Sequence, residues 1–213
     1  MTVSFTACWR RARLSVCRAL LALQLLALGG AVDAQAPAPG KAVITELQLQ
    51  RVDGALELTA QVQFELPHPV EDAMLKGIPM YFVAEAEILR ERWYWTDERI
   101  VGVSRHMRLA YQPLTRRWRL NVGPRPIDSS GQGVTLAQTF DALPEALASV
   151  QRIARWHIAD AASIPTDREH LLRFRFGLDV SQLPRPFQIG AVGESEWELS
   201  VGASVRIPPV GAR

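Results

Sequence analysis

Two extended runs separated by a polar break occupy residues 80–111, which read MYFVAEAEILRERWYWTDERIVGVSRHMRLAY. Within each run apolar residues alternate with polar ones, a pattern typical of half-buried strands. The sequence therefore predicts a β-hairpin whose two arms bury the same face. A two-residue turn at Thr96-Asp97 is expected. In that register Phe82 faces Tyr111, and opposite charges pair on the solvent side.

The tip of this predicted hairpin is rich in aromatic and arginine side chains. The alternation breaks after Ile88, and a β-bulge near Leu89 would restore it. Exposed aromatics interleaved with arginines suit the recognition of a ligand or a protein partner. The candidate binding residues are Arg90, Arg92, Trp93, Tyr94, Trp95, Arg99 and Arg105.

A structural alternative exists for the same residues. The tryptophan rings could complete the edge of a core, while the arginines pair with the neighbouring acids Glu91, Asp97 and Glu98. Aromatic stripes belong to cores more often than to sites, which favours this alternative. Substitution of Arg92 and Trp95 distinguishes the two, because it should abolish either partner capture or folding.

The first 34 residues have the organisation of a secretory signal peptide. A basic start precedes the apolar run Ala19–Leu28, and small residues follow at the positions that a signal peptidase reads. Cleavage is expected after Ala34 or Ala36, which predicts a periplasmic or secreted protein without a stable membrane span. The alternative is an uncleaved segment that anchors the protein in the inner membrane.

Residues 35–213 would form the mature protein. We expect a flexible spacer at 35–42, a single β-rich domain at 43–207 and a tail at 208–213. Both cysteines lie in the leader, so the mature chain would have neither disulfides nor cysteine-based zinc sites. Without the leader the net charge is −1, so charge gives no indication of nucleic-acid binding.

Alternation of apolar and polar residues predicts further strands along the chain. They lie at about 43–52, 56–66, 116–122, 172–180 and 197–205, with a tight turn at Asp53-Gly54. Residues 135–140 are expected to form a short strand or an extended approach to the next element. A short helix is expected at about 70–76, before a glycine and a proline.

A longer helix is predicted at about 142–157, capped by Asp141 and with Pro144 in its first turn. Its apolar stripe would be Leu143, Ala146, Leu147, Val150, Ile153 and His157. The predicted fold class is mainly β: an antiparallel β-sandwich, immunoglobulin-like in general shape, of seven or eight strands with this one helix. The alternative is an α+β open antiparallel sheet with the helix on one face.

Four motifs in order give the chain a family resemblance. They read RERWYW at 90–95, LAYQPLTRRW at 109–118, TFDALPEAL at 139–147 and LDVSQLPRPFQ at 178–188. In these the chain resembles the domain-of-unknown-function family 4390 over nearly all of the mature sequence. The resemblance implies an exported protein of Gram-negative bacteria. Genes of this family often lie beside a sensor-kinase gene, which implies a link to envelope signalling. The family has no established activity, so it assigns no site residue here.

No catalytic, metal or cofactor motif is present in the sequence. The histidines His68, His106, His157 and His170 lack metal-ligand spacing. Paired acids such as Glu85 and Glu87 could serve a glycosidase only in a shared cleft, and Asp179 is interpreted as a cap on the turn at Ser181. The sequence thus predicts a non-catalytic module, without a cofactor, that binds an envelope protein or a cell-wall component. A periplasmic hydrolase that uses paired carboxylates is the alternative.

Overall fold

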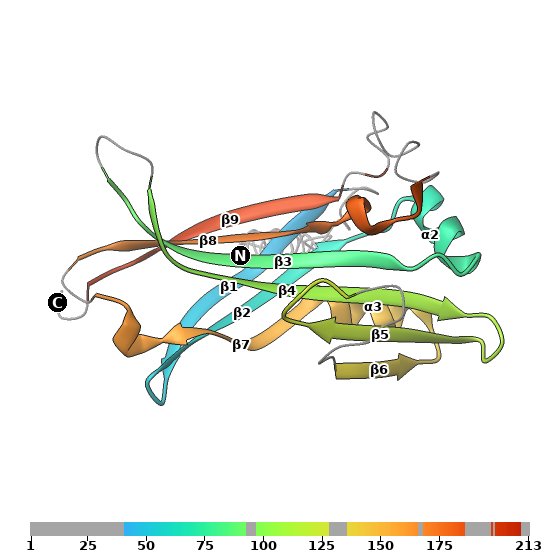
Figure 1. Ribbon diagram of the computed structural model, residues 1–213, viewed down its shortest axis with the longest axis horizontal. Coiled ribbons are helices and arrows are strands. Elements are labelled where there is room, and N and C mark those ends of the chain that lie inside the picture. The colour runs from blue at the N-terminus through green and yellow to red at the C-terminus, as the bar shows by residue number, and fades with distance from the viewer. Residues whose placement is uncertain are drawn as a thin grey trace, which may run out of the picture. The chain divides into compact units, whose positions relative to one another are not determined.

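A computed structural model describes residues 41–92, 97–127, 136–165, 168–185, 197 and 199–209. Within these residues the chain forms nine strands, two α-helices and two short 3-10 helices (Figure 1). The predicted signal peptide and its cleavage sites lie outside the described residues.

The strands make two antiparallel sheets that pack face to face. The smaller sheet has the order β1 (Ala42–Val52), β2 (Ala55–Phe64), β7 (Arg152–Asp160). The larger has the order β6 (Leu136–Phe140), β5 (Arg117–Gly123), β4 (Glu98–Gln112), β3 (Met80–Arg90), β8 (His170–Leu178), β9 (Ser200–Ile207). In Figure 1, β1 and β2 run obliquely behind β3 and β4. The mainly β sandwich is thereby confirmed in place of the open sheet.

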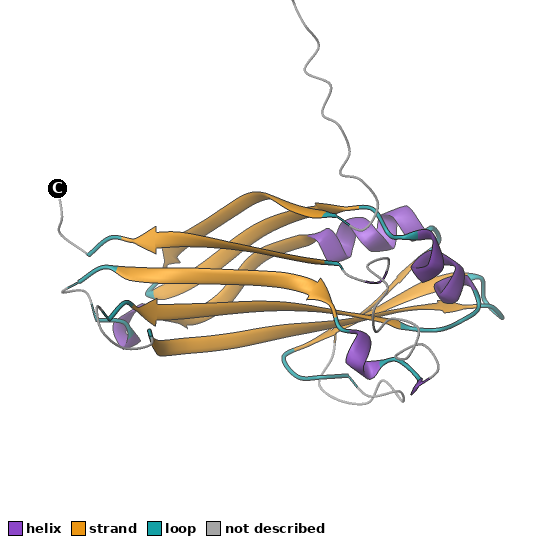
Figure 2. Cartoon of the chain, turned by 90° about the horizontal axis from the view of Figure 1, so that it is seen from above, coloured by secondary structure: helices purple, strands orange, loops and turns teal. Residues whose placement is uncertain are grey.

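In the described part of the chain four helical segments lie between strands. They are α2 (His68–Leu75), α3 (Leu143–Gln151), and the 3-10 helices η1 (Ala161–Ser163) and η2 (Val180–Gln182). Figure 2 shows the two longer helices towards the same end of the strands. The short helix predicted near 70–76 is confirmed as α2, and Gly77 follows it with a φ of 86°, a conformation that glycine adopts at little cost. None of the described helices is both long and apolar enough to cross a membrane.

The first hairpin forms as the sequence predicts. Asp53 and Gly54 both have positive φ angles, 48° and 80°, which is the backbone of the tight turn that Asp-Gly favours. Along β2, every second residue from Leu56 to Phe64 is buried. Burial of one face by alternation is what holds this strand in register.

The core lies between the two sheets. Phe64 of β2 stacks with Phe82 of β3 and Phe176 of β8, at ring-centroid separations of 5.7 and 5.6 Å. Phe82 and Phe176 lie 6.1 Å apart. These three rings join both sheets, and full burial of Phe82 excludes water from the contact.

The central hairpin forms, but the predicted register is wrong. Phe82 faces Met107, not Tyr111, because residues 91–97 make a longer connection than a two-residue turn. The shift is an even number of residues, so the buried face is unchanged. A bulge occurs at the predicted place along the hairpin, between Ile88 and Leu89, but it lies on the opposite strand from the one predicted, because Ile100 of β4 is the extra residue.

The predicted long helix is wrong in its second half. It ends at Gln151, and the chain continues directly as β7, which pairs with the free edge of β2. Ile153 and Ile158 are buried there, while His157, assigned to the apolar stripe, is exposed. A strand partner outweighs the helical spacing of these residues, and β7 raises the described strands above the seven or eight expected.

The predicted helix cap is also corrected. Ala142 is the N-cap residue of α3, and no side-chain hydrogen bond caps the helix. Asp141 instead contacts Arg117 of β5, with 3.1 Å between Oδ1 and Nε. Pro144 lies in the first turn, as expected.

Candidate functional site

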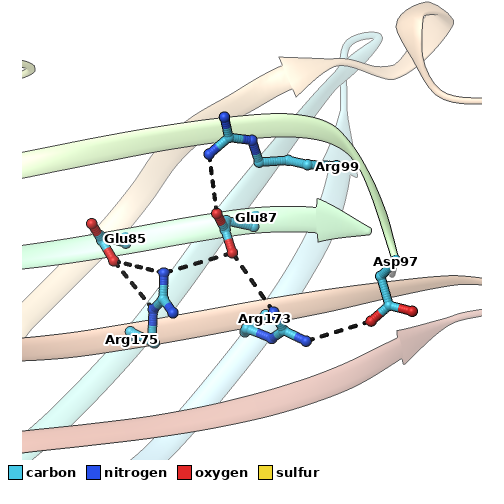
Figure 3. Close-up of polar contacts among 6 residues, drawn as sticks. All are labelled: Glu85, Glu87, Asp97, Arg99, Arg173 and Arg175. Carbon is cyan, nitrogen blue, oxygen red and sulfur yellow. Dashed lines mark hydrogen bonds and ion pairs between the residues drawn. The ribbon is translucent and has the colours of Figure 1, made fainter. Parts of the chain in front are cut away.

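A network of ion pairs covers the outer face of the larger sheet, the face turned away from the smaller sheet (Figure 3). Its members come from β3, β4, β8 and the residue before β4: Glu85, Glu87, Asp97, Arg99, Arg173 and Arg175. Arg175 donates through Nε to Oε2 of Glu85 at 3.2 Å. Oε1 of Glu87 lies 3.3 Å from Nη1 of Arg99, and Oε2 of Glu87 lies 3.7 Å from Nη2 of Arg175. The predicted acid pair is therefore matched by arginines.

Glu87 is the most enclosed acid of this network. Its side chain is 16% exposed, against 44% for Glu85. Arg173 lies 4.0 Å from Glu87 and also contacts Asp97 at 3.6 Å, which ties the base of the hairpin loop to β8. A charge held by several opposite charges away from water is better placed to stabilise the fold than an exposed pair.

The arginines predicted for the hairpin tip have structural partners. Arg90 and Arg92 both contact Oε2 of Glu98, and Arg99 belongs to the ion-pair network. Pairing with Glu98 is what the structural alternative predicted. The aromatic residues Trp93, Tyr94 and Trp95 lie outside the described residues.

Arg105 does not belong to the tip, which corrects the predicted cluster. It faces Ala84, six residues before Arg90 along β3, or about 20 Å along the strand. It also shares a face of β4 with buried Met107, so it points towards the smaller sheet.

The first pocket, here called the outer pocket, lies beside the ion-pair network. It has a volume of about 370 Å³ and is lined by Val83, Glu85, His106, Arg175, Phe176, Gly177, Leu178, Asp179 and Ser200. A Cβ on Gly177 would lie 2.9 Å from the carbonyl oxygen of Leu199, so only glycine fits beside that strand.

Asp179 holds the turn at the end of β8, as predicted. Its Oδ1 accepts hydrogen bonds from the backbone N–H and the hydroxyl of Ser181, at 3.0 and 2.5 Å. Its Oδ2 accepts one from Nε2 of Gln182 at 2.6 Å. Burial raises the pKa of Asp179, but these hydrogen bonds and the charge of His106 outweigh it, so the pKa is lowered.

His106 is the second titratable group of the outer pocket. Its Nε2 lies 3.2 Å from the hydroxyl of Ser104, and its buried Nδ1 has no hydrogen-bond partner. Burial lowers the pKa of His106, and the charges of Asp179 and Glu85 offset part of that effect. The neutral imidazole is therefore favoured in the folded protein.

The second pocket, here called the inter-sheet pocket, is bounded by β4, β5 and β6 of one sheet and by β7 of the other. It has a volume of about 420 Å³ and is lined by Ser104, Arg105, Val122, Gly123, Pro124, Leu136, Ala154, Arg155, Trp156 and His157. No carboxylate is among these lining residues.

Arg105 and Arg155 give the inter-sheet pocket its positive charge. Neither guanidinium has a hydrogen bond or an ion pair within the described part of the chain. Arg105 is half-buried, and burial lowers its pKa, although an arginine remains charged at neutral pH. His157 at the rim lies 3.3 Å from Oδ1 of Asp160.

The sequence pattern predicts only part of this pocket. It indicates Arg105 but places it at the hairpin tip, and it does not indicate Arg155 and Trp156, because their spacing predicts a helix. The signal that could have located them is the run from Ile153 to Ile158, whose β-branched and aromatic residues suit a strand. Among the described residues no group of three or more potential metal ligands occurs.

The comparisons with known proteins give one match. The family model described as "Domain of unknown function (DUF4390)" matches residues 40–206. No curated protein and no solved structure matches the chain.

Proposed function

The chain belongs to the DUF4390 family, and we propose that it is an exported, non-catalytic binding module of the bacterial envelope. The observation that carries this proposal is the uncompensated guanidinium of Arg105 in the wall of the inter-sheet pocket. Export rests on the leader pattern of residues 1–34. The link to envelope signalling rests on the family resemblance.

A half-buried charge without a counter-charge lowers the stability of a folded protein. Desolvation of the guanidinium opposes folding, and among the described residues no acid forms an ion pair with Arg105 that would offset this cost. Such uncompensated groups are found at functional sites, where a ligand supplies the missing charge. The open pocket beside Arg105 offers the space for that ligand.

The hydrolase alternative has weaker support. The outer pocket does hold two carboxyl groups, Glu85 and Asp179, as that reaction requires. A general acid, however, needs a raised pKa, whereas the pKa of Asp179 is lowered and both its oxygens accept hydrogen bonds. Glu85 is paired with Arg175. We therefore favour binding over catalysis.

Photo-crosslinking in living cells tests the proposal. A photoreactive residue replaces Leu136 at the pocket rim, Arg92 at the hairpin tip, or, as a control, exposed Leu114 in the β4–β5 turn. We expect a dominant adduct from position 136 and none from 114. Intact mass would distinguish a small ligand from a protein, and a sensor-kinase adduct would connect the protein to signalling.

The other outcomes are equally informative. An adduct from position 92 alone would move the binding surface to the hairpin tip. No adduct from 92 or 136, in a protein shown to be folded and exported, would overturn the binding function. Sequencing the amino terminus of the periplasmic protein tests export, with residue 35 or 37 expected first.

A further inference from the structure

We infer that the inter-sheet pocket binds a single-chain amphipathic anion, an apolar chain that carries one carboxylate or phosphate group. The inference rests on the proposed binding function and names its ligand class. It is carried by three features of the pocket: its charge, its apolar wall and its size.

The charge of the pocket comes from both sheets. Arg105 belongs to β4 of the larger sheet and Arg155 to β7 of the smaller one, and both line the same pocket. An anion there would meet guanidinium groups from two elements, and none of the described residues that line the pocket carries a carboxylate. A guanidinium presents two parallel donors to a carboxylate or a phosphate, which makes it the side chain best suited to either head group.

The remaining wall is largely apolar. Val122, Leu136 and Trp156 line the pocket, and Leu136 is 69% exposed, although it is a large aliphatic side chain. Val122 and Leu136 face each other on β5 and β6, so they form one continuous surface. A small hydrophilic anion would leave this surface in water, whereas an apolar chain would cover it.

The size of the pocket limits the ligand to one chain. A volume of about 420 Å³ is at the lower end of the range of small-molecule sites. A two-chain phospholipid is several times larger, so the pocket does not enclose one. The ligand is therefore a free single-chain amphiphile and not a lipid held in a bilayer.

Isothermal titration calorimetry on the full chain tests this assignment, with decanoate, decanol and acetate as probes. We expect decanoate to bind, decanol to bind more weakly and acetate to bind least. Arg105→Gln should weaken decanoate binding about ten- to a hundredfold, as loss of a charged hydrogen-bond pair does, and leave decanol binding unchanged. Arg119→Gln, at an exposed arginine of β5 outside both pockets, is the matched control and should bind as the wild type does.

Two further measurements keep the result interpretable. The urea midpoint of Arg105→Gln should be unchanged or higher, because the variant removes an uncompensated charge, so lost binding would not reflect unfolding. Leu136→Ser should weaken decanoate binding and leave acetate binding unaltered. Decanoate that binds to the apolar leader would contribute equally to the titrations of all variants, so it would not affect the comparison between them.

Several outcomes would overturn the inference. The first is that Arg105→Gln and Arg119→Gln bind decanoate with equal affinity. The second is that the wild type binds decanoate and decanol with equal affinity. The third is that binding depends on Arg105 only with phosphatidylglycerol vesicles. If decanoate fails while the probe at Leu136 captures a protein, the binding function stands and only the ligand class is wrong. If both experiments fail, both proposals are refuted.

Discussion

Among the described glycines, Gly177 is the one at which an added methyl group would approach the backbone most closely. A Cβ there would lie 2.9 Å from the carbonyl oxygen of Leu199 and 3.5 Å from Ser200. That carbonyl cannot retreat freely, because it accepts a hydrogen bond from the N–H of Leu178 at 2.8 Å. Gly177→Ala must therefore either strain the backbone or weaken this hydrogen bond.

The expected magnitude follows from opposing effects. Overpacking of this kind costs about 1–3 kcal/mol. Alanine returns about 0.4–1 kcal/mol, because it restricts the unfolded chain more than glycine does. The middle of these two ranges predicts a net loss of about 1.3 kcal/mol for Gly177→Ala.

Gly202→Ala on the neighbouring strand β9 is the matched control. Its Cβ would approach no atom closer than 3.4 Å, the carbonyl oxygen of Phe174. Unfolding in urea, followed by circular dichroism, should place Gly202→Ala between the wild type and about 1 kcal/mol above it, and Gly177→Ala below the wild type. Equal midpoints for the two variants would refute the steric reasoning.

Three further predictions concern charge, backbone and pH. Glu87→Gln should lower the unfolding free energy by about 1–2 kcal/mol and Glu85→Gln by less than about 1 kcal/mol, because Glu87 is more enclosed; equal urea midpoints would contradict this. Arg116→Asn should stabilise the protein by about 0.5 kcal/mol, since Arg116 has a φ of 54° that asparagine tolerates better; a lower melting temperature would contradict it. His106 has a lowered pKa when folded, so the unfolded chain binds the proton first and stability falls as the pH drops through about 6.5. His106→Gln should flatten that decline between about pH 7.5 and 5.5, and an unchanged slope in urea titrations would exclude His106 as its source. Asp179 also has a lowered pKa, and the stability that it contributes is lost only as the pH falls below the ordinary pKa of 3.8.

Local patterns were sufficient for much of the fold. The alternation in β2, the Asp53-Gly54 turn and the cap of Ser181 by Asp179 each depend on residues within a few positions of one another. Such features follow from side-chain direction and backbone preference, which the sequence carries directly. They were accordingly predictable without knowledge of the partner strands.

The candidate site was predictable only in part. The sequence indicates Arg105 as a candidate but cannot place it in one pocket with Arg155, because the helical spacing predicts a helix where β7 forms. The tip arginines Arg90 and Arg92 meet Glu98 through the hairpin register, which depends on the length of the connection. A charge pattern predicts that the arginines form ion pairs with neighbouring acids. The strand register decides which arginine lacks such a partner.

The sequence by itself determined the mainly β class, the positions of most strands and the face that each strand buries. These properties depend on alternation along one chain segment, which is a local quantity. Only the tertiary structure decided the register of β3 on β4, the strand at Arg152–Asp160 and the pocket around Arg105. Each of these depends on which segments, distant in sequence, lie side by side. Residues 152–160 have a helix-like pattern but form a strand, because they pair with the free edge of β2. That strand brings Arg155 into the same pocket as Arg105.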